Sequence, residues 1–191
     1  MKKSKILTLT IFVCKAIAFL QLIALLFCTI LLVKIQNDPQ KYSDYIIEKD
    51  VPSQTILGLP NFKYAKSNIE NADSTVAVSD LNPISLYFIY LQIFIISIFA
   101  FLALKEFIKI IRKVQTVETF QIANVKSFKQ ISKFLLIILL ISSIAIISTQ
   151  KFTYIGFNIN YIPFVLMVLA YVMGEIFNEG NDLAEENKLT I

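Results

Sequence analysis

The chain has 191 residues, of which 56% are hydrophobic and 17% are charged, and its formal net charge is +4. Soluble domains carry about 25% charged residues, so this composition indicates an integral membrane protein. Because the chain contains no His and only two Cys, it excludes a Ser-His-Asp triad, a Cys-His pair, an HExxH zinc site and a four-thiolate zinc site.

Four largely uncharged stretches are candidates for crossing a bilayer, which takes about 20 apolar residues in a helix. We predict an all-α integral membrane protein with four transmembrane helices in a single domain, residues 1–191, and with a small external β element. Buried helices of a soluble protein are the alternative, but residues 93–104 and 134–147 carry only Ser as polar residues. The predicted spans cover residues 13–33, 83–104, 134–150 and 161–177.

The N-terminus also resembles a signal peptide, because Lys2, Lys3 and Lys5 precede an apolar run. That run is far longer than the usual stretch of about 7–15 residues. We therefore expect an uncleaved first span, in which Lys15 reaches the headgroups at its cytoplasmic end. Cleavage or lipid attachment at Cys28 and a transport role for Lys15 are the alternatives.

The distribution of Lys and Arg predicts the orientation, since positively charged loops stay in the cytoplasm. The segment 105–133 carries seven Lys or Arg against two Glu, whereas 34–81 carries five Lys against seven acids. We therefore expect both termini and the segment 105–133 in the cytoplasm, and 34–81 outside. The predicted location is the bacterial cytoplasmic (inner) membrane, crossed several times.

Two stretches of the external loops, 74–79 and 152–159, are rich in β-branched or aromatic residues, which is typical of strands. We predict that these two stretches pair as a small sheet outside the membrane. A loose connector is the alternative for the whole segment 34–81.

Within the basic segment 105–133, apolar residues recur at mostly helical spacing beside three Lys, which predicts an amphipathic helix. This helix would lie on the inner membrane surface or pack on the ends of the second and third spans, and docking of another protein is the alternative. The stripe consists of Phe120, Ile122, Val125, Phe128 and Ile131, beside Lys126, Lys129 and Lys133.

The tail, residues 178–191, is acidic and keeps apolar residues at Leu183 and Leu189. Gly180 is expected to let the chain bend after the fourth span. The tail is either a solvated acidic segment or a recognition segment for a cytoplasmic partner. Whether Lys15 pairs with Glu175 stays open.

The tail resembles the closing signature F-x-x-G-x-x-L-x-E-E-N-x-L-T-[IV] of a bacterial membrane family known as domain of unknown function 2975. A second family pattern, P-F-x-x-x-N-V-K-x-L-x-x-I-G, matches the basic segment. The matching residues there are Phe120, Asn124, Val125, Lys126 and Ile131, whereas Thr119, Phe128 and Ser132 depart from the pattern. Family genes often lie beside one for a small helix-turn-helix regulator, so the resemblance implies a membrane partner of such a regulator.

We expect a non-enzymatic accessory or regulatory protein that contacts the bilayer and a cytoplasmic partner such as a helix-turn-helix regulator. The alternative is a small transporter or transporter subunit, and a membrane enzyme is the least favoured class. No catalytic residue, cofactor, metal or direct binding of nucleic acid is expected, and the oligomeric state stays open. The candidate partner-binding residues are Phe120, Asn124, Lys126, Gly180, Leu183, Glu185, Glu186, Asn187, Leu189 and Thr190.

Overall fold

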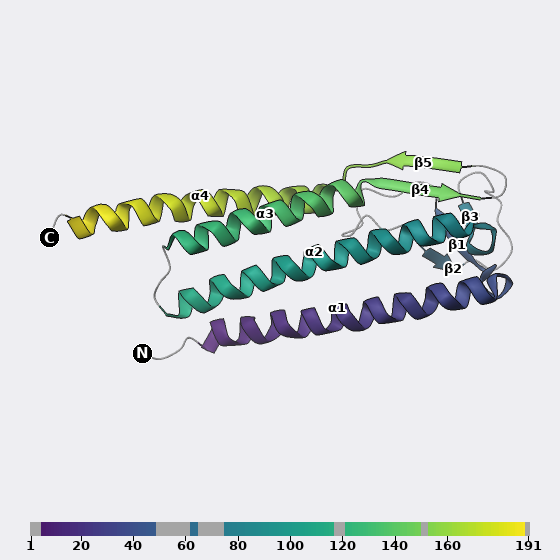
Figure 1. Ribbon diagram of the computed structural model, residues 1–191, viewed down its shortest axis with the longest axis horizontal. Helices are drawn as coiled ribbons and strands as arrows, with labels where there is room; N and C mark the ends of the chain where they lie inside the picture. Colours follow the sequence, from purple (N-terminus) through teal and green to yellow (C-terminus); the bar gives the residue numbers. More distant parts are fainter. Residues whose placement is uncertain (1–4, 49–61, 65–74, 117–120, 150–152, 190–191) are drawn as a thin grey trace. The chain divides into compact units, whose positions relative to one another are not determined.

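The structure is a computed structural model, and four helices form most of the chain that it describes (Figure 1). The helices are α1 (Lys5–Asn37), α2 (Pro83–Gln115), α3 (Ile122–Ser142) and α4 (Tyr161–Leu189). Three of them, α1, α2 and α4, are long and apolar enough to cross a membrane. The predicted class, a mainly helical membrane protein with a small β element, is confirmed. The described residues are 5–48, 62–64, 75–116, 121–149 and 153–189.

The ends of α2 follow local rules that the sequence already contains. Pro83 occupies the first turn, where its missing N–H costs no hydrogen bond. Arg112 and Lys113 lie in the last turn, where positive charge interacts favourably with the helix dipole. The helix therefore continues eleven residues beyond the predicted end of the second span at residue 104.

The third predicted span, residues 134–150, is wrong as a single helix. α3 begins at Ile122 and ends at Ser142, and the chain then forms strand β4 (Ile144–Ser148). Its uncharged helical part, residues 134–142, is only nine residues long, about 13.5 Å, which is less than half of a bilayer core. The uncharged run therefore divides between the end of a helix and a strand.

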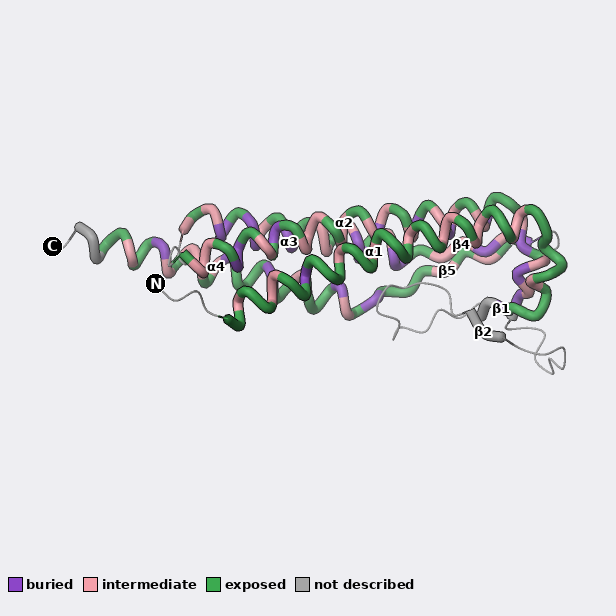
Figure 2. The backbone as a smooth tube through the Cα atoms, turned by 90° about the horizontal axis from the view of Figure 1, so that it is seen from below, coloured by how far each residue is buried: buried purple, intermediate pink, exposed green. Residues whose placement is uncertain are grey.

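The described residues form two compact units, and every helix contributes to both. Unit 1 comprises residues 1–22, 98–138 and 163–191, and unit 2 comprises 23–97 and 139–162. In unit 1 a core of Ile110, Phe128, Ile131 and Ala170 joins α2, α3 and α4. Buried positions recur along these helices, whereas most of α1 is exposed (Figure 2).

Unit 2 contains the β structure. Strand β1 (Tyr45–Glu48) lies between β2 (Phe62–Tyr64) and β3 (Thr75–Ala77) in an antiparallel sheet. A separate antiparallel hairpin joins β4 to β5 (Thr153–Phe157). The two stretches predicted as strands are confirmed, but their predicted pairing is wrong, because β3 pairs with β1 and β5 pairs with β4.

Polar contacts attach the end of β4 to the start of α2 within unit 2. The Asn82 amide donates to Ser148 Oγ at 3.1 Å and to the Thr149 carbonyl at 3.0 Å. The Ser85 hydroxyl donates to the Ser148 carbonyl at 3.1 Å and accepts from the Ser148 N–H. The Asn82 N–H also donates to the Ser148 carbonyl, at 2.9 Å, so several bonds connect the end of the strand to the start of the helix.

Candidate functional site

The amphipathic segment packs on the chain's own helices within unit 1. The rings of Phe128 on α3 and Phe177 on α4 lie with their centroids 4.9 Å apart. At Gly174 a Cβ would come within 3.4 Å of Phe128 Cβ and of Lys129 Cγ, so glycine permits this close approach. The described part, which begins at Ile122, therefore packs on the chain itself, but it is the first part of α3 and packs on α2 and α4, whereas the prediction named the ends of the second and third spans.

A buried polar group joins α2 to α3 beside this contact. Glu106 on α2 is only 8% exposed, and its carboxylate accepts a hydrogen bond from the Ser127 hydroxyl at 3.0 Å. The same carboxylate pairs with Lys109, one turn further along α2. Because the carboxylate has both a cation and a hydroxyl donor, its burial is compensated.

Glu175 on α4 pairs with Lys129 on α3 at 3.0 Å. Both side chains are about two-fifths exposed, at 42% and 41%. Ion pairs that remain this exposed contribute little to stability. The pair therefore orients two helices that the aromatic contact already holds together.

Replacing Glu175 with Gln is expected to change the free energy of unfolding by less than about 1 kcal/mol, because solvent screens the pair. Unfolding of the detergent-purified protein by sodium dodecyl sulfate, followed by circular dichroism, measures this. Lys129→Gln should give the same small value, and the double variant should add no further loss. A loss above about 2 kcal/mol in either single variant would contradict this assignment.

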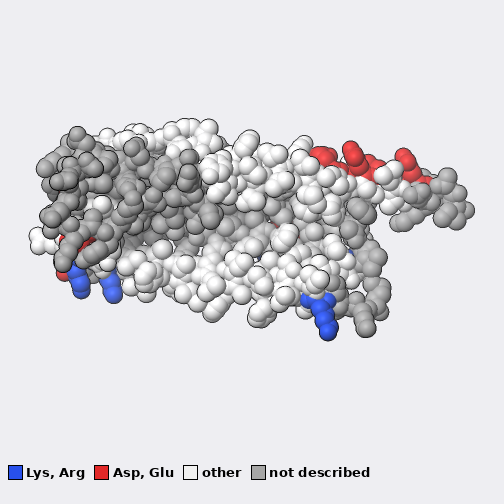
Figure 3. Space-filling model, turned by 180° about the vertical axis from the view of Figure 1, so that it is seen from behind, with Lys and Arg blue, Asp and Glu red and all other residues white. Residues whose placement is uncertain are grey.

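The C-terminal part of α4 presents an acidic face with an apolar residue in its middle. Glu179, Asp182, Leu183 and Glu186 follow the spacing i, i+3, i+4 and i+7, so they lie on one side of the helix. All four are exposed, and Leu183 is 60% exposed. Red acidic side chains gather toward the C-terminal end in Figure 3.

Of the predicted partner-binding residues in the tail, Leu183, Glu185 and Glu186 are exposed. Glu185 accepts a hydrogen bond from the Asn181 amide at 3.2 Å, one turn earlier. The expected bend at Gly180 is wrong, because α4 continues through this residue to Leu189. Asn187 and Leu189 belong to the helical backbone of α4, and Thr190 lies outside the described residues.

The predicted residues of the basic segment separate into different environments. Lys126 is exposed, whereas Asn124 is completely buried and cannot serve as a recognition residue on the surface. Phe120 lies outside the described residues. The second family pattern therefore contributes mainly to packing inside unit 1, through Val125 and Ile131 as well as Asn124.

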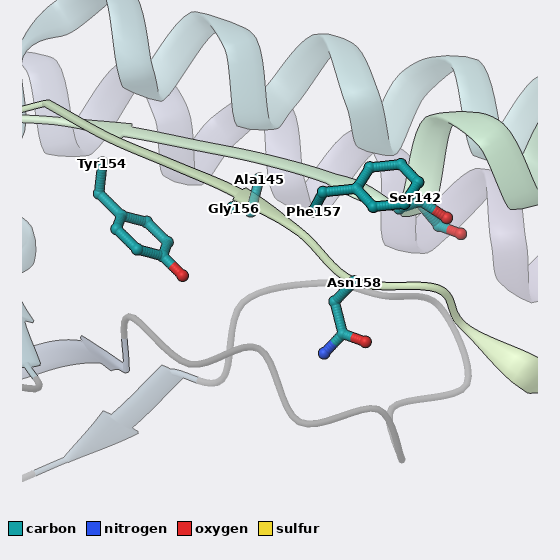
Figure 4. A pocket seen from close by; sticks show the side chains of 7 residues that line it. Ser142, Ala145, Tyr154, Gly156, Phe157 and Asn158 are labelled. Atoms are coloured by element: carbon teal, nitrogen blue, oxygen red, sulfur yellow. The ribbon is translucent and has the colours of Figure 1, made fainter.

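Unit 2 contains a small polar cavity of about 230 Å³ beside the β4–β5 hairpin (Figure 4). Ser142, Ser143, Tyr154 and Asn158 line it together with three other residues. A Cβ at Gly156 would lie 2.8 Å from Tyr154 Cε1, so a larger residue there would require the Tyr154 ring to move. Both Ser hydroxyls donate to the Leu139 carbonyl and so complete the end of α3.

The chemistry of the described residues gives no sign of metal ligation, because no group of three or more Cys, Asp or Glu side chains within them is placed to hold an ion. The volume of the polar cavity is also below the range of about 300–1,000 Å³ that is usual for small-molecule sites. Among the described residues, the candidates for binding are therefore the acidic face of α4 in unit 1 and the side chains around the polar cavity of unit 2.

Sequence reasoning missed Glu106, Ser127 and Gln92, which make the buried polar contacts. Gln92 is the single side-chain amide within the predicted second span, residues 83–104, where a polar side chain needs a partner. In the sequence, nothing distinguishes Glu106 from the other charged residues of the basic segment.

A family model described as "Protein of unknown function (DUF2975)" matches residues 63–191. The match includes α2, α3, α4 and the β4–β5 hairpin, and it leaves α1 outside. Neither the curated proteins nor the solved structures contain a match to this chain.

Proposed function

The chain belongs to the DUF2975 family of proteins of unknown function, and we propose that it is a non-enzymatic accessory or regulatory membrane protein. In this proposal the exposed acidic face of α4 binds a cytoplasmic partner protein. The helices α1, α2 and α4 hold the chain in a bacterial inner membrane, and α3 together with β4 makes the fourth passage that is needed for both ends to lie in the cytoplasm.

The main support for the proposal is the arrangement of acidic and apolar side chains on α4 after its apolar part. An exposed Leu183 lies among Glu179, Asp182 and Glu186 on one helix face. Helices that bind in the groove of a partner present an apolar anchor in such a pattern, surrounded by polar residues. The apolar anchor would supply affinity, and the surrounding acids would select a partner with a basic surface.

A small helix-turn-helix regulator fits this requirement, because DNA-binding domains carry basic surfaces. The frequent position of family genes beside a gene for such a regulator supports the same choice. The acids of α4 are too few to imitate a DNA duplex, so we expect contact through a helix face and not competition for the DNA-binding surface.

The test compares the full-length protein with two variants in co-purification with a small helix-turn-helix regulator that is encoded beside a gene of this family. Leu183→Glu should weaken binding at least about tenfold, which corresponds to about 1.4 kcal/mol. The matched control is Ile122→Glu, because Ile122 is similarly exposed, at 54%, but lies at the start of α3. Equal binding by both variants and the unchanged protein would overturn the assignment of the α4 face.

Salt dependence provides a second readout of the same face. Replacing both Asp182 and Glu186 with the corresponding amides should lower the association rate and flatten its dependence on ionic strength, because rim charges mainly steer encounter. An association rate that keeps its dependence on salt would show that these acids do not face the partner.

A further inference from the structure

A larger cavity, of about 450 Å³, lies in unit 2 between the C-terminal half of α1 and the N-terminal half of α2. On α1 the lining residues include Phe27, Leu31 and Ile35, each four residues from the next, so they lie on one helix face. On α2, Leu86 and Ile93 line the cavity at the same helical repeat, seven residues apart. Two apolar helix faces therefore form opposite walls.

Residues from outside the two helices complete the cavity. Tyr42 comes from the 3₁₀ helix η1 (Pro39–Tyr42), and Val78 comes from η2 (Val78–Asp80). The described lining contains no Lys, Arg, Asp or Glu. The Tyr90 hydroxyl, on α2, shares a hydrogen bond of 3.0 Å with Thr29 on α1, so its polar end is already satisfied.

This lining selects the chemistry of an occupant. The volume of the cavity, about 450 Å³, lies within the range of about 300–1,000 Å³ that is usual for ligand sites. An apolar cavity without polar partners does not hold water well, and it accepts apolar molecules instead. A carboxylate or another charged group inside it would lose its hydration without any compensating cation.

We propose that this cavity binds one acyl chain of a membrane phospholipid, whose headgroup stays outside the cavity. Both walls belong to helices that are long and apolar enough to cross a membrane, so acyl chains are the medium beside them. We choose a phospholipid because its acyl chains form the medium beside these walls, and its charged headgroup needs no partner in the described lining when it stays outside the cavity. The proposal is independent of the partner site on α4, which belongs to unit 1.

The first test measures the phospholipid that remains with the full chain after purification in detergent and exchange into a second detergent. The unchanged protein should retain about one phospholipid per chain, seen by native mass spectrometry. Leu31→Trp and Ile93→Trp should each reduce this amount several-fold, because a larger side chain occupies the cavity. Equal retention by these variants would overturn the proposal.

Leu26→Trp is the matched control, because Leu26 lies on α1 but is 63% exposed and does not line the cavity. It should retain as much lipid as the unchanged protein. A loss of lipid in Leu26→Trp as large as in Leu31→Trp would mean that the bound lipid is not in the cavity.

Photo-crosslinking of the unchanged chain in lipid nanodiscs tests the site without any substitution. A phospholipid with a diazirine in its acyl chain should label peptides that contain residues 27–35 and 86–93 several-fold more than peptides that contain residues 164–169, a mostly exposed stretch of α4. Equal labelling of the two regions would overturn the proposal. Stronger labelling of the cavity by a diazirine fatty acid than by the phospholipid would overturn the choice of phospholipid.

Discussion

Replacing Phe128 with Ala is expected to lower the free energy of unfolding by about 3–5 kcal/mol, the usual cost of removing a buried Phe ring. Phe128 is 8% exposed and belongs to the core that joins α2, α3 and α4 in unit 1. Its ring also contacts Phe177, with centroids 4.9 Å apart, and such aromatic pairs add about 0.5–1.5 kcal/mol. Equilibrium unfolding of detergent-purified protein by sodium dodecyl sulfate measures the loss.

We expect the whole loss of about 3–5 kcal/mol because Phe128 lies among Lys126, Lys129 and Lys133. This charged segment is exposed to water in the unfolded state, so the ring leaves water when the protein folds. Phe107→Ala on α2 is the control, since Phe107 is exposed and should stay within roughly 0.5 kcal/mol of the unchanged protein. Similar losses in the two variants would mean that α3 does not pack as the structure has it.

Replacing Gln92 with Leu is expected to lower the free energy of unfolding by about 2–6 kcal/mol and to loosen the junction between α3 and β4. The Gln92 amide on α2 donates to the Ile141 carbonyl at 2.8 Å and to the Ile144 carbonyl at 3.0 Å. Each carbonyl that loses its buried donor costs about 1–3 kcal/mol. The same unfolding experiment gives the total loss, and hydrogen exchange reports on the N–H groups of β4.

Gln130→Leu provides the comparison for Gln92→Leu, because Gln130 is an exposed residue on α3. It should leave both the unfolding free energy and the exchange of β4 almost unchanged. Unchanged exchange of β4 in Gln92→Leu would show that other donors complete this junction.

Helices α1, α2 and α4 could be predicted because each contains a long apolar run bounded by charged residues. The same rule failed at residues 134–150, where one uncharged run contains both a helix end and a strand. An apolar run does not by itself distinguish a buried strand from a helix. The β-branched Ile144, Ile146 and Ile147 were a local sign of the strand.

The hydrogen bonds that stabilise the end of α3 and the strand after it come from residues that are distant in the sequence. Gln92 lies 49 residues before Ile141, and Ser85 lies 63 residues before Ser148. The pairing of β3 with β1 likewise depends on a strand that sequence analysis did not identify. Such contacts cannot be derived from local propensity, because tertiary partners determine which of two possible local structures is stable.

The candidate site was predictable only in part, for a similar reason. The exposed acids and Leu183 of α4 could be chosen from charge and spacing alone. Asn124 carries the same kind of polar side chain, yet it is completely buried, because neighbouring positions 125 and 128 turn this face of α3 toward the core. The sequence pattern alone does not show which polar residues face the core.

The attachment of β4 to the start of α2 has a consequence for the order of events during synthesis. Ribosomes add about 5–20 residues per second, so the 63 residues between Ser85 and Ser148 take roughly 3–13 seconds. For that interval the Asn82 amide and the Ser85 hydroxyl can bond only to water, headgroups or other temporary partners. The start of the newly made α2 therefore lacks its final partners during this interval, and unit 2 reaches its final structure only after residue 162 has been made.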